Sequence, residues 1–221
     1  MKDNIITVNN VLGTEDFEKL RNRIMDKSFP WYYYDYVVGE DMVKPGTSEY
    51  QQQFVHQFQK HSRIVTQEQY WDILMPIFAV LNPINFVKVK ANLIPKTDKV
   101  VVHGYHVDTI HPCSLTAVFY VNTNNGYTKF KNGVQTPSVA NSMVIFPSYL
   151  NHSGSTCTDE KVRMAININF IPVPDSKYSY LSIPEEICKL TRDWHILQKW
   201  LVSQRLINTH KTEQYIRIQQ G

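Results

Sequence analysis

Three side chains in the middle of the 221-residue chain are of the types that bind a first-row transition metal. His106 and Asp108 are separated by one residue, and alternate residues of a β-strand point to the same face, so both side chains can reach one ion. His152 follows later, just past a short apolar segment and a Pro-Ser-Tyr turn. Two histidines and one carboxylate form the facial triad that favours non-haem Fe(II) and leaves coordination positions open. We therefore predict an iron site made of His106, Asp108 and His152.

A fourth residue, Arg163, begins a segment in which polar and apolar side chains alternate as far as Phe170. The alternation places Arg163 on the same face as Asn167, and we expect this polar face to line a cavity. A buried guanidinium needs an anionic partner, and its planar fork suits a carboxylate. No acidic residue is an evident partner for Arg163, so we predict that it binds a carboxylate ligand.

These residues lie in a region, 86–172, that is typical of a β-rich fold. Alternating or short apolar segments are separated by clusters of turn-forming residues, and many short strands at this spacing predict a double-sheet jelly roll or barrel. The expected strands are 86–93, 115–121, 143–146 and 163–170. We predict a single domain over 1–221, mainly β with flanking helices, in which 86–172 is the jelly-roll core and 1–85 is a helical and aromatic support.

Helices are expected on both sides of this core. Thr14 is the predicted N-cap of an amphipathic helix with acidic residues in its first turn. A second helix is predicted over 66–81, where Pro76 breaks or kinks it. A capping-box pattern at Ser182 predicts a C-terminal helix over 182–210, which either packs on the outside of a sheet or forms a dimer.

Two further features of the N-terminal region invite a structural interpretation. The aromatic residues from Trp31 to Tyr36 are interpreted as core rather than as a platform for a ligand, although whether they line the substrate site stays open. The segment from Phe29 to Tyr34 is expected to be extended. His56 lies in a Gln-rich stretch and is interpreted as a surface or loop residue, with a position of that stretch at the border of the substrate site as the alternative.

The composition is that of an ordinary globular protein, with 43% apolar and 19% charged residues. The net charge of +3 is too small to indicate nucleic acid or membrane as a partner. We recognise no secretory signal, and no segment approaches the roughly 20 apolar residues of a membrane span. The three cysteines are scattered, so we expect reduced thiols and a cytoplasmic location.

The order His-x-Asp, then His, then Arg resembles the Fe(II)/2-oxoglutarate dioxygenase superfamily. A Tyr-x-Asn strand over 115–122, followed by Gly126 and an apolar strand to Phe130, resembles its prolyl 4-hydroxylase-like branch. The segments 29–33 and 53–58 are similar to small members of that branch from phages and marine bacteria. The resemblance is specific over 86–172 and looser outside. Relatives often have Gly-Gly where this chain has Gly126-Tyr127, which leaves the substrate-side loop undefined.

The resemblance implies a double-stranded β-helix, a jelly roll of the cupin-like kind, that uses Fe(II), 2-oxoglutarate and O2. Arg163 then pairs with the distal carboxylate of 2-oxoglutarate, and the Tyr120 hydroxyl reaches the same carboxylate. Asn167 is expected to make a further polar contact with the cosubstrate. Asn92 matches a polar position near the iron, or else faces solvent together with Lys88 and Lys90.

The expected reaction is hydroxylation of an unactivated C–H bond, because related halogenases lack the carboxylate that Asp108 provides. A prolyl or other peptidyl residue, or a small molecule such as an amino acid, is the substrate that the resemblance implies. One alternative is a 2-oxoglutarate oxygenase that modifies nucleic acid, which the small net charge does not favour. Another is a non-catalytic cupin-like module that binds metal without consuming O2.

Overall fold

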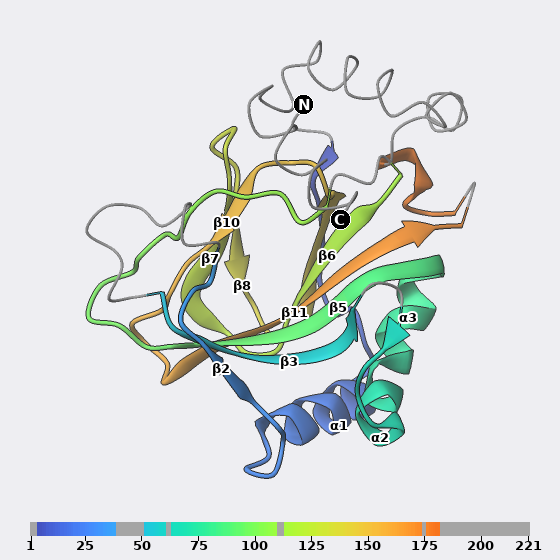
Figure 1. Ribbon diagram of the computed structural model, residues 1–221. Coiled ribbons are helices and arrows are strands. Elements are labelled where there is room, and N and C mark those ends of the chain that lie inside the picture. The colour runs from blue at the N-terminus through green and yellow to red at the C-terminus, as the bar shows by residue number, and fades with distance from the viewer. Residues whose placement is uncertain (1–3, 39–50, 61–62, 110–112, 174–175, 182–221) are drawn as a thin grey trace, which may run out of the picture.

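The computed structural model describes residues 4–38, 51–60, 63–109, 113–173 and 176–181. Two antiparallel sheets form the body of the protein (Figure 1). The larger has the strand order β1-β9-β6-β11-β5-β3-β2, with β4 paired to β3, and the smaller has the order β10-β7-β8. The strands are β1 (Ile6–Val8), β2 (Tyr32–Tyr34), β3 (Gln53–Lys60), β4 (Arg63–Ile64), β5 (Pro83–Pro95), β6 (Leu115–Tyr120), β7 (Asn124–Phe130), β8 (Gln135–Ser138), β9 (Ser142–Pro147), β10 (His152–Gly154) and β11 (Val162–Pro172). The predicted double-sheet jelly roll is confirmed.

Helices cover one face of the larger sheet (Figure 1). They are α1 (Thr14–Met25), α2 (Glu68–Trp71), the 3-10 turn η4 (Asp72–Leu74) and α3 (Met75–Leu81). Leu20 and Ile24 of α1 are fully buried in the same core as Ile166 and Ile168 of β11. The apolar face of β11 therefore packs toward the helices, which leaves its polar face for the space between the sheets.

The helix boundaries correct two details. Gly13, not Thr14, occupies the N-cap of α1, and no side chain caps that end. The acidic residues Glu15 and Asp16 do lie in the first turn, as predicted. The segment 66–81 is divided into three short helices, and Pro76 lies in the first turn of α3, where its missing N–H costs no hydrogen bond.

The aromatic N-terminal segment is extended at β2, as expected, but it is not core. Tyr32, Tyr33 and Tyr34 are exposed, because β2 is the outermost strand of its sheet. Of the aromatic residues from Trp31 to Tyr36, only Trp31 packs against the core, where it contacts the buried Phe29. The surface interpretation of His56 is also wrong. Its ring is buried on β3, with Nδ1 2.8 Å from the Pro30 carbonyl oxygen and Nε2 2.8 Å from Thr66 Oγ1.

The expectations for the C-terminal helix, the cysteines and a membrane span have three different outcomes. The C-terminal helix predicted over 182–210 lies outside the described residues. Cys157 is a free, buried thiol, whereas Cys113 is disulfide-bonded, so the expectation of three reduced thiols fails at Cys113. None of the described helices is long and apolar enough to cross a membrane. The cytoplasmic location stays a prediction.

Candidate metal centre

His106 and His152 are brought side by side by a single antiparallel bridge. The His106 N–H donates to the His152 carbonyl at 2.9 Å, and the His152 N–H donates to the His106 carbonyl at 3.0 Å. Asp108 is fixed next to them, because its N–H donates to the Ser148 carbonyl at 3.2 Å. The His-x-Asp segment is thus an isolated bridge rather than a full strand, yet its side chains converge as the spacing of two predicted.

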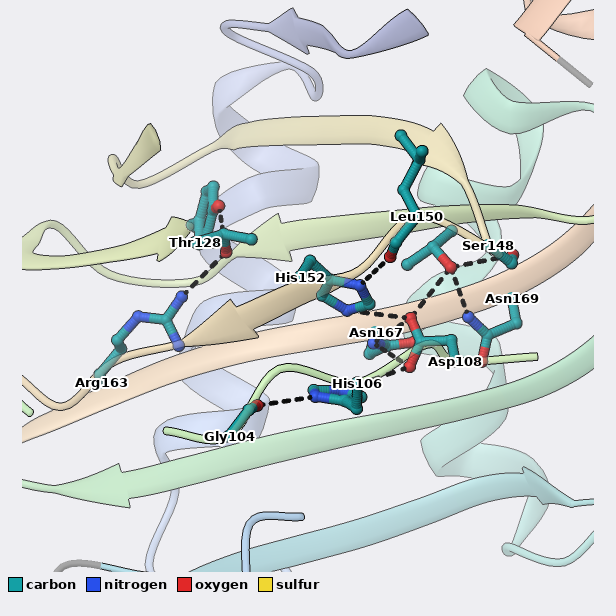
Figure 2. Close-up of polar contacts among 12 residues, drawn as sticks. Gly104, His106, Asp108, Thr128, Ser148, Leu150, His152, Arg163, Asn167 and Asn169 are labelled. Carbon is teal, nitrogen blue, oxygen red and sulfur yellow. Dashed lines mark hydrogen bonds and ion pairs between the residues drawn. The ribbon is translucent and has the colours of Figure 1, made fainter. Parts of the chain in front are cut away.

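One ligand atom from each of His106, Asp108 and His152 lies within 4.8 Å of the others (Figure 2). The Nε2 atom of His152 is 3.4 Å from Asp108 Oδ2, and that of His106 is 4.0 Å from Oδ1. Atoms that bind one ion at about 2.1 Å and at right angles lie about 3 Å apart, so these separations suit a shared ion after a small adjustment.

The outer nitrogen of each ring is directed at a backbone carbonyl (Figure 2). His106 Nδ1 lies 3.3 Å from the Gly104 oxygen, and His152 Nδ1 lies 2.9 Å from the Leu150 oxygen. An Nδ1–H that donates to a carbonyl leaves the Nε2 lone pair available for a metal. Both histidines are therefore oriented as metal ligands.

The surroundings of His106 and Asp108 favour the protonation states that a metal requires of these two residues. Burial, and then the adjacent His152, lower the pKa of His106 to about 3. Burial by itself raises the pKa of Asp108, but His152 and then His106 more than offset it and hold that pKa well below its usual value. Neutral imidazoles and an ionised carboxylate are the forms that bind divalent metals.

A polar network behind Asp108 holds the carboxylate in place (Figure 2). The Thr116 hydroxyl donates to Oδ2 at 2.9 Å, and the Asn167 amide donates to the same oxygen at 3.2 Å. Asn169 in turn donates to the Thr116 hydroxyl at 2.8 Å. Partners of this kind orient a ligand and tune its affinity for the metal. Sequence reasoning did not assign Thr116 or Asn169 to the site, although strand alternation places both on the cavity face.

Arg163 is buried nearby and is bound by neutral side chains. Its Nε donates to Ser138 Oγ at 2.8 Å and its Nη2 to Thr128 Oγ1 at 3.4 Å. The Tyr120 hydroxyl donates to the same Thr128 oxygen at 2.8 Å, and the Tyr120 ring lies 5.6 Å from the guanidinium carbon. Burial lowers the pKa of Arg163, but a guanidinium stays protonated in proteins. Among the described residues no carboxylate forms an ion pair with Arg163.

The two parts of the site belong to one cavity. His106, His152 and Arg163 all line it, together with Asn92 and Asn167. The Oδ1 atoms of both asparagines are buried and have no hydrogen-bond partner among the described residues. Asn92 is thus placed in the cavity wall rather than toward bulk solvent. Asn167 lies between the cavity and Asp108, because its amide donates to the Asp108 carboxylate while the residue also lines the cavity.

Comparison with known proteins finds no matching family model and no matching curated sequence. Solved structures do match. An oxidoreductase of the 2OG-Fe(II) oxygenase family from Burkholderia pseudomallei has a TM-score of 0.53 at 9% identity, over 77% of this chain and 86% of that one. A prolyl hydroxylase from Trichoplax adhaerens, solved with a peptide of hypoxia inducible factor, has a TM-score of 0.51 at 12% identity, over 81% and 87%.

A third similar structure is a non-haem α-ketoglutarate-dependent epimerase of nogalamycin biosynthesis. Its TM-score is 0.52 at 13% identity, over 76% of this chain and 78% of that one. These proteins share an architecture and not a single reaction, so the match establishes the fold and leaves the reaction to the site. The chain has the jelly-roll fold of the 2OG-Fe(II) oxygenases.

Proposed function

We propose that this protein is an Fe(II)- and 2-oxoglutarate-dependent dioxygenase that hydroxylates an unactivated C–H bond. The observation that carries the proposal is the pairing, in one cavity, of a His-Asp-His donor set with a buried guanidinium that has no acidic partner among the described residues. The donor set would bind a metal, and the guanidinium would bind one end of a dicarboxylate. A module that only binds metal does not need the guanidinium.

The donor set fits Fe(II) by its chemistry. His106, Asp108 and His152 would hold the ion, and the bound metal and cosubstrate would supply O2 activation coupled to the conversion of 2-oxoglutarate to succinate and CO2. Arg163 and the Tyr120 hydroxyl bind the distal carboxylate of 2-oxoglutarate. Asn92 of β5 and Asn167 of β11 offer further polar contacts to the cosubstrate from the same sheet that carries Arg163.

The substrate class is the finer part of the proposal. We assign a peptidyl residue, such as a prolyl residue, or a small molecule such as an amino acid. The prolyl hydroxylase among the similar structures binds a peptide on the same fold. Asp108 supports hydroxylation, because its carboxylate would bind the metal at a position that a halide would otherwise need.

The test begins without oxygen. Purified apoprotein is mixed with Fe(II) and 2-oxoglutarate, and the weak visible charge-transfer band of the iron chelate is recorded. O2 is then admitted and succinate is measured. We expect a band followed by succinate in the wild type. His106→Ala and Asp108→Ala should remove both signals, and Arg163→Ala should weaken 2-oxoglutarate binding.

Lys131→Ala serves as a control, because this exposed lysine lies outside the cavity. Folded wild-type protein that gives neither band nor succinate would refute the proposal. Metal binding without O2 consumption would instead favour the binding-module alternative.

A further inference from the structure

The strand register puts two lysines on the cavity side of β5. In the β5–β11 pair, Lys90 lies opposite Asn167, and Lys88 lies opposite Asn169. Residues directly opposite each other in an antiparallel pair point to the same face. Asn167 lines the cavity that holds the metal donors, and Lys90 lines it as well.

Lys90 has no ion-pair partner among the residues that the structure describes. Neither Lys90 nor Lys88 forms an ion pair or hydrogen bond with any residue that the structure describes. The residues that line the cavity include no carboxylate, and Asp108 behind them is already engaged by two histidines. Burial, and then repulsion by Lys88, lowers the pKa of Lys90 to about 8. An ammonium group in such surroundings is costly unless an anion joins it.

In the site loaded with Fe(II) and 2-oxoglutarate, the other charges balance one another without Lys90. Fe(II) with two neutral histidines and Asp108 carries one positive charge, and Arg163 adds a second. The two carboxylates of 2-oxoglutarate balance these two charges. Lys90 and Lys88 then stand as uncompensated positive charge beside the position where a substrate must approach the metal.

We propose that Lys90 is a specificity-determining residue that binds an anionic group, a carboxylate or a phosphate, of the primary substrate. Lys88 strengthens the positive potential from the next cavity-facing position on β5. This inference rests on the proposed function and narrows its substrate class to acidic molecules. A neutral internal prolyl residue without an adjacent anionic group is thereby disfavoured.

The test measures binding to the loaded protein. Wild-type protein is loaded anaerobically with Fe(II) and 2-oxoglutarate, and the chelate band verifies loading. Calorimetric titrations then use three probes: N-acetylglycinate, methyl phosphate and the neutral N-acetylglycinamide. The variants are Lys90→Gln, Lys90→Glu and the control Lys96→Glu, which makes the same charge change at an exposed residue just beyond β5.

We expect wild type and Lys96→Glu to bind at least one anion and not the amide. Lys90→Gln should weaken anion binding about tenfold or more, since hydrogen bonds to charged groups are worth that much, and Lys90→Glu should abolish it. The tighter of the two anions identifies the group as carboxylate or phosphate.

Equal anion affinity in Lys90→Gln, no anion binding by loaded wild type, or equally tight binding of the amide would overturn the inference. A tenfold loss of 2-oxoglutarate affinity in Lys90→Gln would assign the lysine to the cosubstrate and overturn it too. A wild type that forms no chelate band identifies a failure of the proposed function itself, and the inference falls with it.

Discussion

The contact between Gly126 and Arg163 makes a sharp prediction. A Cβ atom added at Gly126 would lie 2.7 Å from Arg163 Cδ and 2.8 Å from the Thr156 carbonyl oxygen. Non-bonded carbon atoms are most stable at about 3.5–4.0 Å, so the first contact is too short by roughly 1 Å. The backbone oxygen cannot move away as a flexible side chain can, and therefore the Arg163 side chain must shift.

We expect Gly126→Ala to cost about 1–3 kcal/mol of unfolding free energy, the usual range for overpacking a buried site. Because the displaced group is the guanidinium proposed to bind 2-oxoglutarate, the dissociation constant of the cosubstrate should rise about tenfold or more, which corresponds to roughly 1.4 kcal/mol. Titration of the anaerobic chelate band measures the affinity, and chemical denaturation measures the stability.

Two other glycines supply matched controls. Gly133 has φ +93° with nothing near its added Cβ, so Gly133→Ala should lose stability through backbone strain and keep its affinity for 2-oxoglutarate. A Cβ at Gly154 would lie 3.5 Å from Arg163 Nη1, an ordinary contact, so Gly154→Ala should change little. A folded Gly126→Ala variant with wild-type affinity for 2-oxoglutarate would show that Arg163 is not positioned by this contact, or does not hold the cosubstrate.

Three more substitutions test the network around the site and the support beneath it. Thr116→Val keeps the side-chain shape but removes the hydroxyl that donates to Asp108, so Fe(II) affinity should fall about 10–100-fold in a metal titration; unchanged affinity would deny the network a role. Tyr120→Phe removes the hydroxyl beside Arg163, and 2-oxoglutarate affinity should fall about threefold to tenfold, measured by the same band titration. His56 lies buried on β3, outside the cavity. Burial lowers its pKa below 6.5, so the unfolded chain binds a proton at this histidine more readily than the folded protein does. The contribution of His56 to the unfolding free energy should therefore be fully present above about pH 6.5 and decrease as the pH falls below that value. His56→Gln should show a smaller decrease over the same pH range. An identical pH dependence of stability in both proteins would contradict this.

The part of the site that depends on the alternation of side chains along one strand could be predicted from the sequence. A spacing of two puts His106 and Asp108 on one side, and the alternation from Arg163 to Phe170 separates a cavity face from a core face. Both features depend only on the geometry of an extended chain. The β5, β6 and β11 strands were found for the same reason.

Contacts between distant segments could not be predicted in this way. Alternation places Thr116 on the cavity face, but only the register of β6 against β11 brings it next to Asn169 and Asp108. The approach of Gly126 to Arg163 likewise joins two strands of different sheets. Such pairings are set by how the strands and sheets pack together, and the alternation of residues within one segment does not reveal them.

Two interpretations failed because composition does not specify position within the fold. Tyr32 to Tyr34 have the residue types of a core strand, yet β2 is the outermost strand of its sheet and leaves them exposed. His56 lies among polar residues in the sequence, but on β3 it faces the helices and is buried. Hydropathy alone distinguishes neither an edge strand nor the face on which one polar residue lies.

The central claim is that one cavity binds Fe(II) through His106, Asp108 and His152 and holds 2-oxoglutarate against Arg163. A crystal structure grown without oxygen in the presence of Fe(II) and 2-oxoglutarate, with anomalous data at the iron edge, tests it most directly. We predict one strong anomalous peak within about 2.0–2.2 Å of both Nε2 atoms and an Asp108 oxygen, and a dicarboxylate whose distal end contacts Arg163. An iron peak elsewhere, or a 2-oxoglutarate molecule that leaves Arg163 without a carboxylate, would contradict the claim.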